Sequence, residues 1–174
     1  MTILVTGGSG SGKSVWAEKA IHALNPGQKI YLATMQAYDP ESEKRIRRHR
    51  LQREGLNFIT IECPLNLSSA HIDCDTSVLL EDIPNLLANE MFGGGNDARI
   101  LPDLKTLSRT CEHLIIVTND VFSDGICYPD ETALYMKRLG MINSELASLS
   151  DTVTEVVYSI PVFIKGRFPH HPLP

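Results

Sequence analysis

The feature that most constrains the fold is a glycine-rich run near the start of the chain. The run reads Gly7-Gly8-Ser9-Gly10-Ser11-Gly12-Lys13-Ser14, which matches G-x-x-x-x-G-K-[ST] in full. Apolar residues precede it at 3–5, and an amphipathic segment begins near Lys13. A strand, a glycine loop and a helix in this order are the context of a phosphate-binding loop. A flexible turn that binds nothing is the alternative, and it does not explain why both flanks agree with the motif.

The residue types of this loop suit a polyphosphate ligand. Glycines allow backbone N–H groups to turn inward around an anion, and the following helix presents its positive N-terminal end to the same anion. We expect Lys13 to reach the β- and γ-phosphates and Ser14 to hold Mg²⁺. The predicted nucleotide-binding residues here are Gly7, Gly8, Ser9, Gly10, Ser11, Gly12, Lys13 and Ser14. The loop therefore predicts a site for a nucleoside triphosphate.

Short apolar runs alternate with helical patterns along the rest of the chain. The predicted strands are 2–6, 29–34, 57–61, 77–81, 113–118, 153–158 and 162–165, and the predicted helices are 13–24, 41–54, 83–92, 99–111 and 130–149. Nearly continuous apolar strands between helices predict an α/β fold, with a mainly parallel sheet covered by helices on both faces. The last two strands are joined at Ser159-Ile160-Pro161, which favours an antiparallel hairpin at the edge.

Length, composition and charge narrow the class of protein. The 174 residues predict a single domain over 1–166, followed by a flexible tail at 167–174 that holds three prolines. A net charge of −5 argues against a nucleic-acid partner. No apolar run approaches the roughly 18–20 residues of a membrane span. The four cysteines show no C-x-x-C spacing, which favours reduced thiols. We expect a cytoplasmic protein.

A basic segment at residues 44–53 is the second informative stretch. It contains six lysines and arginines in ten residues and no acid, in a chain that is acidic overall. A basic helix near a phosphate loop can clamp phosphates through charge-assisted bonds, although a solvated basic face explains the charges equally well. His49 lies among these cations, which disfavour its protonation and leave a neutral, nucleophilic imidazole. The candidate phosphate-binding arginines are Arg45, Arg50 and Arg53.

Carboxylates at strand ends are the candidate metal and nucleotide contacts. Glu81 and Asp82 close the predicted strand 77–81, and in phosphate-loop proteins a carboxylate there is linked to Mg²⁺. We favour Glu81 for that role. Asp82 is also placed to cap the helix that follows at Ile83-Pro84. Glu62 ends the preceding strand, and nucleotide contact and a structural role both remain open for it.

Together these residues resemble the pattern of a known enzyme family. Its most specific stretch is R-I-x-x-H-R-x-x-R at 45–53, and the resemblance extends from Leu4 to about Gly166. Other matching residues are Ala33-Thr34, Asp39, Glu41, Glu62, Pro64-Leu65, Val78–Glu81, Asn89, Asn119, Gly140, Asn143, Asp151, Ile160-Pro161 and Lys165-Gly166. The sequence is similar to the bifunctional adenosylcobinamide kinase/adenosylcobinamide-phosphate guanylyltransferase family of cobalamin (vitamin B12) biosynthesis.

The resemblance implies a RecA-like phosphate-loop domain that assembles as a trimer. It implies Mg²⁺ as cofactor, ATP and GTP as substrates, and the corrinoid adenosylcobinamide as the partner that is phosphorylated and then receives GMP. His49 matches the residue that accepts GMP in this family. A plain small-molecule kinase and a regulatory NTPase or binding module are the alternatives. The chain departs from the family pattern at 82–84 and 120–138, where we expect contacts with the acceptor substrate.

Overall fold

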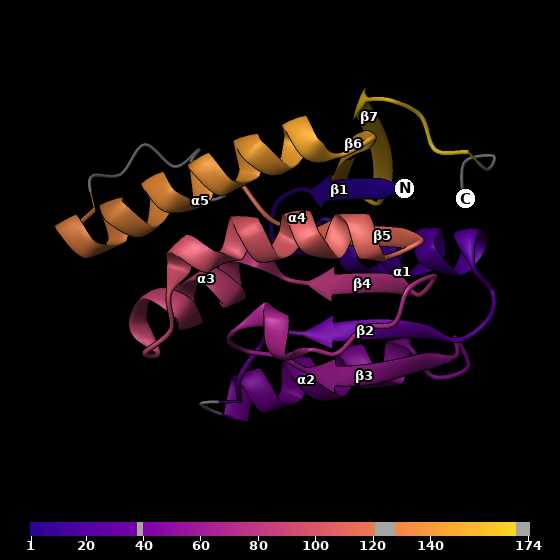
Figure 1. Cartoon of the computed structure of the whole chain (residues 1–174), viewed down its shortest axis with the longest axis horizontal. Helices are drawn as coiled ribbons and strands as arrows, with labels where there is room; N and C mark the ends of the chain where they lie inside the picture. Colours follow the sequence, from indigo (N-terminus) through magenta and orange to yellow (C-terminus); the bar gives the residue numbers. More distant parts are fainter. Residues whose placement is uncertain (38–39, 121–127, 170–174) are drawn as a thin grey trace.

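The computed structural model describes residues 1–37, 40–120 and 128–169, which form one seven-stranded sheet with helices around it (Figure 1). The strands are β1 (Thr2–Thr6), β2 (Lys29–Ala33), β3 (Phe58–Glu62), β4 (Ser77–Glu81), β5 (His113–Val117), β6 (Thr152–Val157) and β7 (Ile160–Lys165). The α-helices are α1 (Lys13–Leu24), α2 (Pro40–Gln52), α3 (Ile83–Phe92), α4 (Ile100–Thr110) and α5 (Asp130–Leu149), and short 3₁₀ turns span Leu67–Ser69 and Asp97–Arg99.

The sheet has the order β3-β2-β4-β5-β1-β6-β7. Every neighbouring pair is parallel except β6 and β7, which are antiparallel. This confirms the predicted α/β class with its antiparallel edge hairpin. Because the parallel strands point the same way, the loop after β1 and Glu81 at the end of β4 both lie at the carboxyl ends of the strands. Ligands bind at the carboxyl ends of the strands in open α/β sheets.

Two hydrophobic cores lie on opposite faces of the sheet. Leu4, Leu80 and Leu114 face the core beneath α3, α4 and α5, whereas their neighbours Ile3 and Leu79 face the core beneath α1. In Figure 1, α3, α4 and α5 lie in front of the sheet and α1 lies behind it. Burial of both faces explains why the strands read as continuous apolar runs. The prediction of helices on both faces is confirmed.

The hairpin turn begins one residue earlier than the sequence suggested, and it is shorter. Tyr158 and Ser159 form the turn, with φ angles of 50° and 66°, and Ile160 and Pro161 already belong to β7. The prediction of a junction at 159–161 was therefore wrong. Two consecutive residues with positive φ make a connection whose twist matches that of the flanking strands. Pro161 is tolerated because β7 is an edge strand.

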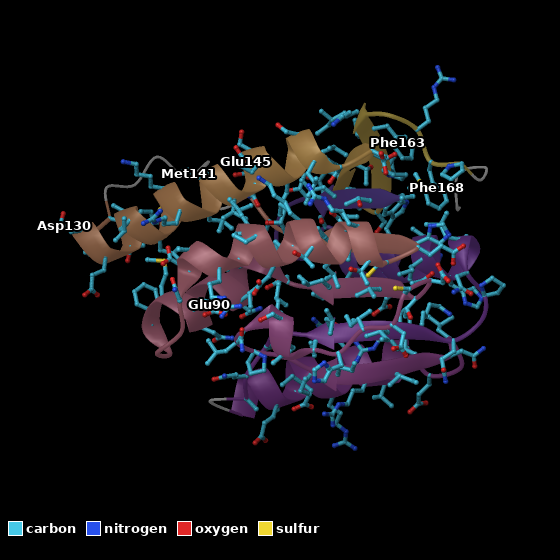
Figure 2. All side chains as sticks on the ribbon, viewed as in Figure 1. Glu90, Asp130, Met141, Glu145, Phe163 and Phe168 are labelled. Carbon is cyan, nitrogen blue, oxygen red and sulfur yellow. The ribbon has the colours of Figure 1, made fainter. Side chains whose placement is uncertain are left out.

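The residues that follow β7 return to the body of the molecule. Phe163 and Phe168 lie together at this end of the sheet (Figure 2), and both rings pack edge-on against Trp16 of α1 at centroid distances of 6.3 and 5.7 Å. The Thr152 hydroxyl donates a hydrogen bond to the backbone carbonyl of Arg167. His170 and His171 of the predicted tail lie outside the described residues. Of the helices in the described ranges, none is both long and apolar enough to cross a membrane.

Candidate functional site: a phosphate loop faced by a basic helix

The glycine loop links β1 to α1 as the motif predicts. Gly12 precedes the helix with a φ of 92°, a left-handed conformation that costs glycine little. A Cβ atom there would lie 2.5 Å from the hydroxyl oxygen of Ser159, in the β6–β7 turn. The backbone N–H of Ser159 also donates to the carbonyl of Ser11 at 2.8 Å. The edge hairpin therefore supports the loop from outside, and only glycine fits at the contact.

Lys13 and Ser14 occupy the first turn of α1, where backbone N–H groups lack intrahelical partners. The Lys13 ammonium donates to the carbonyl of Gly8 at 3.1 Å, so the amine lies folded back over the loop. The loop and helix end thus gather N–H donors, a positive helix end and an ammonium group around one point. This is the environment that a polyphosphate requires.

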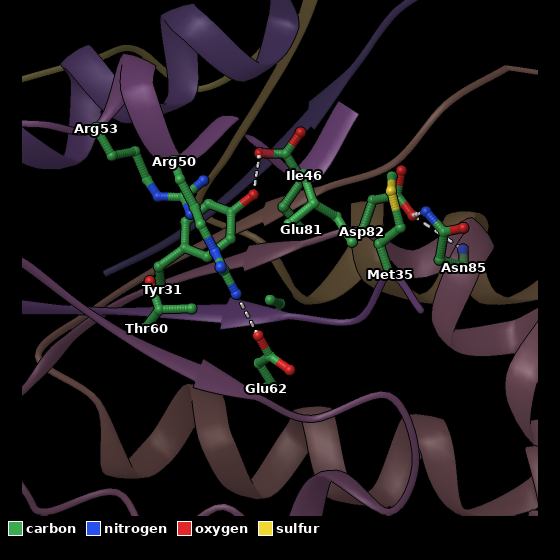
Figure 3. A pocket seen from close by; sticks show the side chains of 11 residues that line it. Tyr31, Met35, Ile46, Arg50, Arg53, Thr60, Glu62, Glu81, Asp82 and Asn85 are labelled. Carbon is green, nitrogen blue, oxygen red and sulfur yellow. Dashed lines mark hydrogen bonds and ion pairs between the residues drawn. The ribbon is translucent and has the colours of Figure 1, made fainter. Parts of the chain in front are cut away.

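Glu81 connects this loop to the centre of the sheet. One carboxylate oxygen accepts a hydrogen bond from the Ser14 hydroxyl. The other accepts one from the Tyr31 hydroxyl at 3.2 Å, which Figure 3 shows. Burial raises the pKa of Glu81, while the bonds from Ser14 and Tyr31 and the charges of Arg53 and Lys13 lower it. Burial is the largest of these effects, so the pKa of Glu81 lies above its ordinary value.

The oxygen atoms of Ser14 and Glu81 suit Mg²⁺, which prefers hard oxygen ligands. In the described part of the chain no three His, Cys, Asp or Glu residues are grouped as a metal site. Mg²⁺ is commonly held by one or two protein oxygens together with substrate phosphates and water. The residues present therefore fit a metal that arrives with the nucleotide.

Asp82 has a different task from its neighbour Glu81. Its carboxylate accepts hydrogen bonds from the backbone N–H and the side-chain amide of Asn85, at 2.9 and 2.7 Å, which caps α3. Pro84 stands in the first turn of the same helix. Burial raises the pKa of Asp82 to about 6, and the bonds from Asn85 oppose the rise. Asp82 is therefore the helix cap that the residue pattern allowed.

A cleft of about 520 Å³ opens over the loop. Residues 9–15, Glu81 and Asp82 line it together with Met35, which follows β2, and Arg48 of α2. Arg48 is exposed, and the part of the chain described here brings its positive charge to the same cleft as Lys13. The basic helix and the phosphate loop therefore border one space.

A second cleft lies between α2 and the ends of β2 and β3. Its lining includes Met35, Ile46, Arg47, Arg50 and Glu62. Arg50 and Glu62 form an ion pair at 2.6 Å with both side chains more than half exposed (Figure 3). An exposed pair of this kind adds little stability, so a ligand can displace it at small cost. Met35 lines both clefts and connects the two spaces.

Arg53 points inward, unlike Arg50. Its guanidinium carbon lies 3.4 Å from the centre of the Tyr31 ring, and Nη1 lies 3.9 Å from Oε1 of Glu18 in α1. Both side chains of this ion pair are at most 5 % exposed. Burial and the charge of Glu81 raise the pKa of Glu18 to about 7, and Arg53 opposes that rise.

The predicted site residues thus lie around α2. The loop, Glu81, Arg50 and Glu62 border the two clefts, and Arg53 lies beneath α2. His49 and Arg45 belong to α2 by their backbone, and their side chains lie outside the described part.

Three neighbours of this site escaped sequence reasoning: Glu18, Tyr31 and Met35. The periodicity of helices and strands could have identified two of them, Glu18 and Tyr31. Glu18 follows Ser14 by four residues on a helix, and Tyr31 alternates onto the face of the sheet that α1 covers.

Comparisons with known proteins agree with this architecture. The sequence profile of the cobinamide kinase / cobinamide phosphate guanyltransferase family matches residues 3–164. The bifunctional adenosylcobalamin biosynthesis protein CobU of Salmonella typhimurium is 34 % identical, with 95 % of this chain and all of the relative aligned. CobP of Pseudomonas aeruginosa, described in the same terms, is 29 % identical, with 96 % and 99 % aligned.

Solved structures show the fold alone. A KaiC-like protein of Pyrococcus horikoshii superposes with a TM-score of 0.53 at 15 % identity, covering 99 % of this chain and 82 % of that protein. The family is shown by the sequence matches, which extend over nearly the whole chain and include the loop, α2 and β4. The chain is a member of the cobinamide kinase / cobinamide phosphate guanyltransferase family.

Proposed function

We propose that this enzyme phosphorylates adenosylcobinamide and then transfers GMP from GTP to the phosphorylated product. Family membership supports the two activities, and the names of the relatives support the place in cobalamin biosynthesis. The observation that carries the proposal is the cleft bordered by Lys13 and Ser14 on one side and Arg48 of α2 on the other. Cations from two separate elements border one space, as the transfer of phosphoryl and nucleotidyl groups requires.

In the kinase step a hydroxyl of adenosylcobinamide attacks the γ-phosphorus of ATP or GTP, and the nucleoside diphosphate leaves. The backbone N–H groups of the loop and the Lys13 ammonium hold the phosphates and neutralise their charge. Ser14 and Glu81 would hold Mg²⁺, which supplies further charge neutralisation when bound. The chain's own contribution is mainly positioning and electrostatics.

In the guanylyl step we assign the nucleophile to His49. Its imidazole attacks the α-phosphorus of GTP, a P–N bond forms, and pyrophosphate leaves. A phosphate oxygen of adenosylcobinamide phosphate then displaces the histidine and accepts GMP. Two displacements replace one difficult transfer, which is the logic of covalent catalysis. The position of His49 supports this assignment, because Arg48 and Arg50 on either side of it in α2 line the two clefts.

Incubation with α-labelled GTP tests the proposal. We expect label on the denatured protein that is lost in acid and retained in alkali, as a phosphoramidate would be, and that is released by adenosylcobinamide phosphate. If ATP phosphorylates the corrinoid while the protein never carries label, the enzyme is a plain kinase. If nucleotide binds and neither reaction occurs, the chain is a regulatory or binding module, and the proposal fails.

We further propose that the chain assembles as a trimer, as the family resemblance implies. The support from the structure is an apolar surface on the edge hairpin. Tyr158, Ile160, Val162 and Ile164 are between 48 % and 89 % exposed there. Exposed apolar residues on an edge strand favour pairing with another chain. Light scattering should give three times the chain mass for the parent and a smaller mass for Ile164→Glu, and a monomeric parent would refute the assembly.

A further inference from the structure

Four side chains connect α2 to the phosphate loop: the buried Glu18, Tyr31 and Arg53, and the partly buried Glu81. Arg53 directly follows α2, and its guanidinium lies 3.4 Å above the Tyr31 ring of β2. The Tyr31 hydroxyl reaches Glu81 of β4 at 3.2 Å (Figure 3). Glu81 in turn accepts the hydrogen bond from Ser14. A continuous chain of contacts therefore runs from the end of α2 to the first turn of α1.

A second contact closes this chain into a ring. Arg53 lies 3.9 Å from Glu18, and Glu18 stands four residues after Ser14 in α1. Residues four apart lie on the same face of a helix, so Ser14 and Glu18 both point toward β2 and β4. α2 is thus tied to α1 directly through Glu18 and indirectly through Tyr31 and Glu81.

Arg53 differs from the other cations of the basic segment. Among the lysine and arginine side chains that the structure describes at 44–53, Lys44, Arg47, Arg48 and Arg50 are exposed and Arg53 alone is buried. Burying a guanidinium is costly unless it is paired. Glu18 lies 3.9 Å away, too far for a hydrogen bond, and the Tyr31 ring supplies a flat surface against which the planar group stacks. This geometry holds Arg53 in one place, where it borders a small cavity with Tyr31 and Glu81 and lines neither of the two clefts described above (Figure 3).

We propose that Arg53 and Tyr31 are positioning residues for guanylyl transfer, which hold α2 against α1 and β4 so that His49 meets a nucleotide bound at the phosphate loop. His49 stands one helical turn before Arg53, so a shift of Arg53 is transmitted to it through the helix. Displacement of a reacting group by about 1 Å can lower a rate by two orders of magnitude. This inference rests on the proposed function, because it assumes that α2 carries the nucleophile.

The test compares the two reactions of one enzyme. Arg53→Met removes the charge and the stack at similar volume, and Lys44→Met on the exposed side of α2 is the matched control. We expect Arg53→Met to lower the rate of labelling from saturating α-labelled GTP at least about tenfold relative to its kinase rate. The equilibrium Kd for GTP should stay within about twofold of the parent value, because a positioning residue does not touch the nucleotide. Lys44→Met should change neither ratio nor Kd.

A conservative variant guards against simple loss of folding. Arg53→Lys keeps the charge beside Glu18 and loses the planar stack, so its labelling rate should fall between those of the parent and Arg53→Met. Equal loss of both activities in the two variants would make Arg53 a structural residue. A weakened Kd for GTP with an unchanged labelling rate at saturation would make it a nucleotide contact. Either result overturns the inference.

The result for the parent separates this inference from the proposed function. If the parent labels and both Arg53 variants label at the same rate, the positioning role alone is wrong. If the parent never labels, guanylyl transfer through His49 is wrong, and the positioning role is overturned with it.

Discussion

Ser14 donates a hydrogen bond to Glu81, which joins the first turn of α1 to the end of β4 across 67 residues of sequence. β5 lies between β4 and β1 in the sheet, so this bond passes over the carboxyl end of β5, beside the phosphate loop. The Ser14 hydroxyl oxygen and the Glu81 carboxylate are the predicted ligands of Mg²⁺, and in this structure they are hydrogen-bonded to each other. If Ser14 and Glu81 hold Mg²⁺ as proposed, the metal would replace this hydrogen bond, so the loop and β4 would act together.

Lys13→Ala should lower the rate of phosphoryl transfer about a hundredfold or more and leave the fold intact. The Lys13 ammonium donates a hydrogen bond to the backbone carbonyl of Gly8 in the loop, at 3.1 Å. Loss of one preorganised donor from the transition state costs about 3 kcal/mol, or on the order of a hundredfold in rate. The kinase rate and the thermal midpoint should be measured together, with Lys19→Ala on the exposed side of α1 as the control. Near-parental turnover in Lys13→Ala would exclude its assigned role.

Glu81→Gln should weaken the response to Mg²⁺ more than it weakens nucleotide binding without metal. Glutamine keeps one oxygen that can accept from Ser14 or Tyr31, and its NH₂ group can donate to the other hydroxyl, but it lacks the charge that a divalent cation prefers. Titration of kinase activity with Mg²⁺ should show a midpoint at higher concentration, and Glu112→Gln at the surface should show none of this change. An unchanged titration would make Glu81 a structural residue.

His49→Asn should lose covalent label from α-labelled GTP and keep kinase activity. The two reactions would then depend on different groups: the phosphate loop for γ-transfer and α2 for guanylyl transfer. Asparagine keeps a polar side chain on the helix but cannot act as the nucleophile. Peptide mapping of the labelled parent should place GMP on residue 49. Label on any other residue, or full labelling of the variant, would contradict the assignment.

Glu18→Gln should change how stability depends on pH. Burial raises the pKa of Glu18 from 4.5 to about 7, so between these values the folded chain binds a proton that the unfolded chain has released. The free energy of unfolding therefore falls as pH rises through this window, by at most about 1.4 kcal/mol per pH unit from this group. Glutamine does not titrate and removes the fall.

Urea denaturation at pH 5, 6 and 7 measures this difference. The free energy of unfolding of Glu18→Gln relative to the parent should increase with pH across the series. The exposed neighbour Glu54→Gln serves as control and should show no such trend. A constant difference between Glu18→Gln and the parent would mean that Glu18 keeps its ordinary pKa in the folded protein.

Gly12→Ala should destabilise the protein more than Gly8→Ala. Gly12 has a φ of 92°, and an added Cβ would meet the Ser159 hydroxyl at 2.5 Å, whereas nothing lies within 4 Å of a Cβ at Gly8. A left-handed conformation costs an alanine roughly 1 kcal/mol even without the clash. Thermal melts of the two variants should therefore differ, with Gly12→Ala the lower. Equal midpoints would show that the hairpin does not press on the loop.

Much of the fold could be read from local pattern. The glycine loop, the bounds of α1, α3 and α5, and the apolar strands depend on neighbours in sequence, and the structure confirms them. The capping role of Asp82 is local too, because it depends on the residues that directly follow it. The predicted position of the hairpin turn was wrong because tyrosine and serine, unlike glycine or asparagine, rarely adopt the positive φ that Tyr158 and Ser159 have here.

The sequence by itself determined that a triphosphate loop, a basic helix and acidic strand ends are present, because each is a run of adjacent residues. It could not determine which arginine faces a cleft and which is buried, since Arg50 and Arg53 belong to the same basic segment. Tertiary packing decided this by placing Tyr31 and Glu18 beneath the end of α2, where Arg53 reaches them. The same packing brought Ser14 to Glu81. Such contacts join residues far apart in the chain, and only the order of strands in the sheet makes them neighbours.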